Sequence, residues 1–135
     1  MDFMSAMLDY GHCSTESAAE RPALRTFSTG ATRDDDADKL DYEGFLSPVV
    51  LERYARYMNA HRRQQDGTLR DSDNWQRGIP RAQYVKSLWR HFMDVLLVTR
   101  GWPDKATTKS LEEALCAVLF NAMGLLHEIL IGRSA

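Results

Sequence analysis

The sequence predicts an all-α fold, a helical bundle built from three long helices. Apolar residues recur every three or four positions over residues 48–65, 81–100 and 111–131, which places them on one face of each helix. Short connections between successive helices are typical of an up-down bundle. The chain has 135 residues, of which 44% are hydrophobic, so it is long enough to form one domain with a buried core.

The first predicted helix begins at Ser47-Pro48, because serine is a preferred N-cap and proline suits the first helical position. Arg62 and Arg63 suit the C-terminal end of the helix dipole, and Asp66-Gly67 provides a stop. The residues expected on the buried face of this helix are Leu51, Tyr54, Ala55, Met58 and His61.

The second predicted helix ends at Gly101-Trp102-Pro103, and Ser110 caps the third. Near its middle the third helix is apolar around most of its circumference. One partner helix cannot cover so wide a surface, so the sequence predicts self-association into a homo-oligomer, either a dimer or a tetramer.

Residues 1–35 are rich in Ser, Thr, Ala, Gly and charged residues, with little helical periodicity. We therefore expect an irregular N-terminal arm, followed by the helical domain over residues 36–135. Acidic residues cluster between positions 34 and 43. The cluster is most simply a solvated linker, and the alternative is a segment from which Arg33, Asp41 or Glu43 reaches back into a site.

Composition and charge argue against several classes of function. The formal net charge of −2 gives no basic excess of the kind that nucleic-acid binding needs. No uninterrupted apolar run approaches the roughly 20 residues of a membrane-spanning helix. The N-terminus lacks the pattern of a secretory signal, and Cys13 and Cys116 show no metal-ligand spacing, so we expect a reduced, cytoplasmic protein.

A polar stripe lies on the second predicted helix. Lys86, Arg90 and Asp94 are spaced four residues apart and share one face, with Ser87 and His91 alongside. The two basic side chains suit phosphate groups. Each residue taken alone also fits a solvated helix face.

Two acidic residues, Glu112 and Glu113, open the third predicted helix, and Asn121 is a polar exception further along it. Asp94 and Glu112 meet only if the second helix ends early or its connection folds back. Carboxylates that converge in this way repel one another unless a cation lies between them, which favours Mg²⁺ or Mn²⁺. The helix dipole alone also favours glutamate at this position.

The connection over residues 66–80 is rich in turn residues and contains Asn74-Trp75. Loops of this length in a compact domain are often functional. Trp75 fits two roles equally well: it stacks on a base, or it packs the loop onto the core.

Three stretches of the chain resemble the MazG-like all-α nucleotide pyrophosphohydrolases, and more specifically the phage-type dATP/dGTP diphosphohydrolases that include the MazZ branch. The three stretches are KLDYEGFLSP at residues 39–48, DNWQRGIP at 73–80 and SLWRHFMD at 87–94. EEALCA at 112–117, with Phe120-Asn121, extends the likeness. His91 and Cys116 stand where the paired acidic motifs of the family have a Glu and an Asp.

The resemblance implies hydrolysis of a purine deoxynucleoside triphosphate, dGTP before dATP, to the monophosphate and pyrophosphate, with Mg²⁺ or Mn²⁺ as cofactor. It also implies a homo-oligomer with sites at subunit interfaces. Such an enzyme would remodel the deoxynucleotide pool of a phage in the cytoplasm of its bacterial host.

The expected site has two parts. Asp94, Glu112 and Glu113 bind metal and carry catalysis, with a glutamate activating water, and His91 and Asn121 support the metal. The residues expected to bind substrate are Lys86, Arg90, Asn74, Trp75, Arg77 and Glu43. The alternative is a non-catalytic helical homo-oligomeric interaction protein, in which the polar stripe is a solvated face or an interhelical salt-bridge network.

Overall fold

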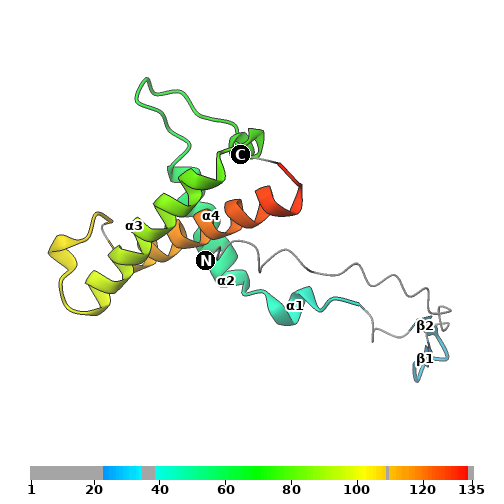
Figure 1. Cartoon of the computed structure of the whole chain (residues 1–135). Coiled ribbons are helices and arrows are strands. Elements are labelled where there is room, and N and C mark those ends of the chain that lie inside the picture. Colours follow the sequence, from blue (N-terminus) through cyan, green and yellow to red (C-terminus); the bar gives the residue numbers. More distant parts are fainter. Residues whose placement is uncertain (1–22, 35–38, 109, 134–135) are drawn as a thin grey trace, which may run out of the picture. The chain divides into compact units, whose positions relative to one another are not determined.

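The computed structural model describes residues 23–34, 39–108 and 110–133, and this part of the chain is mainly helical, as expected. The chain divides into two compact units, Met1–Asp41 and Tyr42–Ala135. Within the described residues, the helices lie in the second unit (Figure 1). They are α1 (Tyr42–Phe45), α2 (Pro48–Ala60), η2 (Asn74–Arg77), α3 (Arg81–Thr99), η3 (Pro103–Lys105) and α4 (Leu111–Leu130).

The first unit contains a short antiparallel hairpin, formed by β1 (Leu24–Thr26) and β2 (Thr32–Asp34). Its turn is closed by a hydrogen bond from the Phe27 N–H to the Ala31 carbonyl at 2.9 Å, and Gly30 has a φ of +83°. The prediction of an irregular segment is therefore wrong for residues 24–34, where a turn containing a glycine joins two short paired strands. Residues 1–22 and 35 of the predicted arm lie outside the described residues.

Helix α2 begins where the sequence predicts, with the Ser47 hydroxyl accepting a hydrogen bond from the Val50 N–H at 3.4 Å. It ends at Ala60, five residues before the predicted end at residue 65. The next residues turn back on themselves, because Gly67 adopts a φ of +83° and Arg63 pairs with Leu69 in an antiparallel bridge. The turn at Asp66-Gly67 therefore includes the residues from 61 onwards, so Arg62 and Arg63 follow the helix and are not its last turn.

Helices α3 and α4 form the packed centre of the second unit, and Figure 1 shows them running antiparallel. Tyr84 on α3 is buried against α4, where Ala114 and Ala117 are also buried. A Cβ atom at Gly124 would lie only 2.3 Å from Cε1 of Tyr84. Glycine is therefore required on α4 at the point where the tyrosine ring crosses it.

Much apolar surface remains exposed outside this centre. The predicted buried face of α2 is only partly covered, since no residue of α2 is buried and Leu51 is 49% exposed. By length and composition α4 is apolar enough to cross a bilayer, although polar residues interrupt its apolar runs. Core helices of soluble proteins meet the same criterion, and α4 contributes most of the buried residues in the described chain.

Candidate functional site

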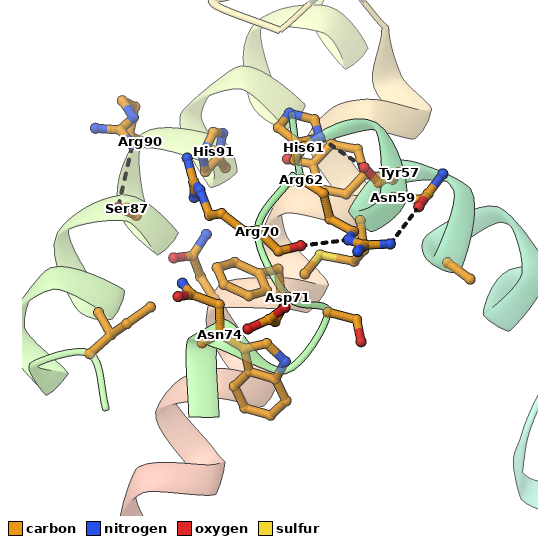
Figure 2. Close-up of a pocket in the computed structure, with 17 residues that line it drawn as sticks. Tyr57, Asn59, His61, Arg62, Arg70, Asp71, Asn74, Ser87, Arg90 and His91 are labelled. Atoms are coloured by element: carbon orange, nitrogen blue, oxygen red, sulfur yellow. Dashed lines mark hydrogen bonds between the residues drawn. The ribbon is translucent and has the colours of Figure 1, made fainter. Parts of the chain in front are cut away.

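A cavity of about 710 Å³ lies within the second unit and is lined by α2, the connection that follows it, α3 and α4 (Figure 2). Residues 61–79 form the wall between the ends of α2 and α3. This connection holds its shape through backbone hydrogen bonds, including one from the Arg70 N–H to the Arg62 carbonyl at 2.9 Å. The volume lies within the usual range for small-molecule sites, which is roughly 300–1,000 Å³.

Three arginines line this cavity: Arg62, Arg70 and Arg90. The Arg62 Nε donates to the Arg70 carbonyl at 2.7 Å, and the Arg90 Nη2 donates to the Ser87 hydroxyl at 3.3 Å. Figure 2 shows Arg62 and Arg70 on the side of the connection, with Ser87 and Arg90 on the side of α3. Asp71 is the one carboxylate among the lining residues, so the cavity favours an anionic ligand.

Aromatic and amide side chains form the rest of the lining. The Trp75 ring packs edge-on against Phe120 at a centroid distance of 6.5 Å, and against His127 at 4.9 Å. Trp75 therefore packs its loop onto α4 and lines the cavity at the same time. Asn74 and Asn121 also line the cavity, and the buried Asn121 amide donates to the Ala117 carbonyl at 2.8 Å.

His91 lies at the α3 wall, and behind it the Asp94 carboxylate is buried. Asp94 accepts hydrogen bonds from the Thr107 N–H at 2.8 Å and from the Thr107 hydroxyl at 2.6 Å. Burial alone raises the pKa of Asp94, but the two Thr107 hydrogen bonds and His91 outweigh it, so this pKa lies below its usual value. Asp94 therefore fixes the connection between α3 and α4 as an ionised carboxylate.

The surroundings of His91 favour the neutral imidazole, because they lower its pKa. Its Nδ1 lies 3.6 Å from the Asp94 carboxylate, which is too long for a good hydrogen bond. Burial and the neighbouring Arg90 lower the pKa of His91, and together they outweigh the opposite effect of Asp94. An unprotonated imidazole at a cavity wall can accept a proton.

The predicted carboxylate ligands do not converge in one chain. The Glu112 carboxylate pairs with Arg53 Nε on α2 at 2.7 Å, and its side chain is 72% exposed. Glu113 follows in the first turn of α4 and, like Glu112 and Asp94, is not among the residues lining the cavity. Over residues 23–34, 39–108 and 110–133, no three His, Cys, Asp or Glu side chains are placed to hold a metal ion. The described residues of one chain therefore do not bring the predicted ligands of Mg²⁺ or Mn²⁺ together.

The remaining predicted substrate residues are dispersed. Arg77 lies outside the main cavity but lines a smaller polar one of about 470 Å³, which shares Arg70, Asp71 and Asn74 with it. There Arg77 pairs with Asp71 at 3.1 Å. Lys86 on α3 and Glu43 on α1 are exposed and line neither of these two cavities.

Sequence reasoning missed the contribution of Arg62 and Arg70. In the sequence Arg62 fits a helix-terminal charge, and Arg70 belongs to no pattern of its own. The signal that identifies them is Asp66-Gly67, because a turn at that point returns the chain and brings position 70 back beside position 62. His61 and Tyr57 join the lining from the same end of α2.

No protein-family model, curated protein or solved structure matches this chain. The residues of the cavity and the motifs of the sequence are therefore the basis for a functional proposal.

Proposed function

We propose that this chain hydrolyses purine deoxynucleoside triphosphates, dGTP before dATP, to the monophosphate and pyrophosphate. The observation that carries the proposal is the combination of three arginines with aromatic side chains in one cavity. A nucleotide has the matching two parts, a polyanionic tail and a flat, apolar-faced base. The motifs that resemble the MazG-like hydrolases give the reaction type, and remodelling of a phage nucleotide pool is the corresponding role.

In this proposal the arginines hold the triphosphate. Guanidinium groups bind phosphate oxygens through paired, charge-assisted hydrogen bonds. Arg62 and Arg70 come from the connection after α2 and Arg90 comes from α3, so a single triphosphate can bridge these two walls of the cavity. The same groups would stabilise the negative charge that develops on the leaving pyrophosphate.

The base is assigned to the aromatic and amide side of the cavity. Trp75 and Phe120 offer ring faces and edges, and Asn74 offers an amide for hydrogen bonds to base or sugar. Because Trp75 is already braced against α4, it can receive a base without a large loss of side-chain freedom.

His91 is assigned the role of general base, in place of the glutamate expected from the sequence. Water attacks the α-phosphorus, the bond from that phosphorus to the bridging oxygen breaks, and the proton of the water passes to the neutral imidazole. Mg²⁺ or Mn²⁺ remains part of the proposal as a requirement to be measured. We assign it no ligand and no step, since the carboxylates of one chain do not converge.

The direct test is release of pyrophosphate from dGTP by the purified protein with Mn²⁺, with and without EDTA. Arg70→Gln removes one phosphate contact and should raise KM about tenfold, the equivalent of roughly 1.4 kcal/mol. Arg56→Gln is the matched control, because Arg56 is exposed on α2, where it forms an ion pair with Glu52 one turn away and does not line the cavity. Absence of pyrophosphate release from every dNTP would refute the proposal.

The role of His91 has its own test. His91→Gln should lower kcat by about 10²-fold or more while KM changes little, because a general base acts in the transition state. Equal loss of kcat in the Arg56→Gln control would show that the effect is not specific to His91.

A second candidate, a non-catalytic helical interaction protein, is favoured by the exposed apolar side chains of α3 and α4. Trp89 is 67% exposed and Leu126 is 54% exposed. Thermal unfolding distinguishes the two functions: stabilisation by dGTP with Mn²⁺ supports the enzyme, since a ligand at 100 times its Kd adds about 2.7 kcal/mol. No shift with any nucleotide supports the interaction protein.

A further inference from the structure

The segment after α4 holds the turn that carries Trp75. In Figure 1 this red segment turns back towards the part of the chain that precedes α3. Its Arg133 Nη1 donates a hydrogen bond to the Gln76 carbonyl in η2 at 2.6 Å. A Cβ atom at Gly78 would lie 3.0 Å from the same nitrogen, so the guanidinium lies directly against the backbone that follows η2.

A buried carboxylate lies beneath this contact. Glu128, on the last turn of α4, is only 2% exposed, and its Oε1 is 3.6 Å from Arg133 Nη1. Within the described residues this oxygen has no hydrogen-bond partner. A buried carboxylate requires a nearby positive charge, so Glu128 favours the position that Arg133 occupies.

The same end of α4 also contacts Trp75 directly. His127 packs against the Trp75 ring at 4.9 Å, one residue before Glu128. The η2 turn is thus held through the indole ring and through the Gln76 carbonyl. Both contacts come from a stretch of seven residues, His127 to Arg133.

We propose that Arg133 is a positioning residue for nucleotide binding. It fixes the η2 turn and so presents Asn74 and Trp75 to the cavity, although Arg133 itself does not line it. Arg81 reinforces the arrangement, because its Nη2 donates to the Glu128 carbonyl at 3.0 Å at the start of α3. This inference rests on the proposed nucleotide-binding function of the cavity.

The test compares Arg133→Gln, Arg133→Lys and the Arg56→Gln control in the full chain. Arg133→Gln should raise KM for dGTP about tenfold and leave kcat within about twofold, because a displaced loop weakens binding in ground and transition state alike. Arg133→Lys keeps a positive charge near Glu128 and a donor for the Gln76 carbonyl, so its KM for dGTP should be close to that of the parent. The control should behave as the parent.

A second measurement needs no nucleotide. The Gln76 and Gly78 amides are hydrogen-bonded within the turn, at 2.8 Å to Asp73 and 3.3 Å to Trp75. Their hydrogen exchange should become faster in Arg133→Gln, while exchange in the centre of α3 stays unchanged. Unchanged exchange, or faster exchange with unchanged KM, would overturn the positioning role.

The two readouts separate the two proposals. Suppose that the parent neither hydrolyses nor binds any dNTP, while hydrogen exchange at η2 still depends on Arg133. The proposed function then fails, and Arg133 keeps only a structural role. If the parent binds dGTP and all three variants bind it equally, the function stands and the positioning role is refuted.

Discussion

Asp94 illustrates how a single carboxylate acquires its role from a partner thirteen residues away. Both of its oxygens accept hydrogen bonds from Thr107, which holds the connection between α3 and α4 against the side of α3. Nothing in the local spacing of the sequence distinguishes such a carboxylate from a metal ligand. Its lowered pKa reflects this structural use.

Thr107→Val should destabilise the fold at neutral pH. The change removes the hydrogen bond from the Thr107 hydroxyl to the Asp94 carboxylate and leaves the one from the Thr107 N–H. Loss of a hydrogen bond to a charged group lowers the free energy of unfolding by about 1.5–3 kcal/mol. Because the folded pKa of Asp94 is lowered, its contribution is present above the ordinary value of about 3.9 and is lost as the pH falls through the folded pKa. Urea denaturation at pH 7 and at successively lower pH should show the difference from the parent shrinking in acid. A difference that stays constant with pH would contradict this account.

Tyr54 presents the opposite situation, a polar atom without a partner. Its hydroxyl is buried, and within the described residues it makes no hydrogen bond. Burial raises the pKa of Tyr54 to about 12. Tyr54→Phe removes the unsatisfied group and keeps the ring, so we expect no loss of stability and a gain of up to about 1 kcal/mol. Thermal unfolding checks this, and a clear loss would show that the hydroxyl has a partner in solution.

At the scale of elements, the contact between α3 and α4 depends on Gly124. In Gly124→Ala the new methyl group would meet the Tyr84 ring at 2.3 Å. Overpacking costs about 1–3 kcal/mol, against a gain in helix propensity of about 1 kcal/mol. We expect net destabilisation in chemical denaturation. In a Tyr84→Ala background the same change should be harmless or stabilising, and equal losses in both backgrounds would contradict the contact.

Capping and periodicity predict the helices well and the site only in part. The starts at Pro48, Arg81 and Leu111 follow from local signals such as the Ser47 and Ser110 caps. The cavity depends instead on which segments meet in space. Arg62 and Arg70 line it together because the chain reverses at Gly67, and helix periodicity does not predict this. Glu128 is likewise buried by residues distant in sequence or beyond the helix end, since Arg81 at the start of α3 and Arg133 after α4 both approach it.

For the whole molecule, the exposed apolar faces of α3 and α4 predict a dimer or tetramer in solution. Trp89 and Leu126 are the test positions, because each is more than half exposed on a long helix. Trp89→Glu or Leu126→Glu should shift the mass from light scattering towards the monomer, since a charge in an apolar interface is costly. Lys86→Glu, an exposed charge change on α3, is the control. A monomeric parent would refute self-association.

The buried thiol of Cys116 provides a way to follow the molecule as it opens. The side chain is 5% exposed, and burial raises its pKa, so in the closed protein it is protonated and out of reach of alkylating reagents. In a Cys13→Ser chain, the alkylation rate of Cys116 should therefore report how often α2 separates from α4 and exposes the thiol. Rapid alkylation under native conditions, at the rate of a free thiol, would contradict this. If dGTP slows the alkylation further, nucleotide binding suppresses the same opening of the helices that exposes Cys116.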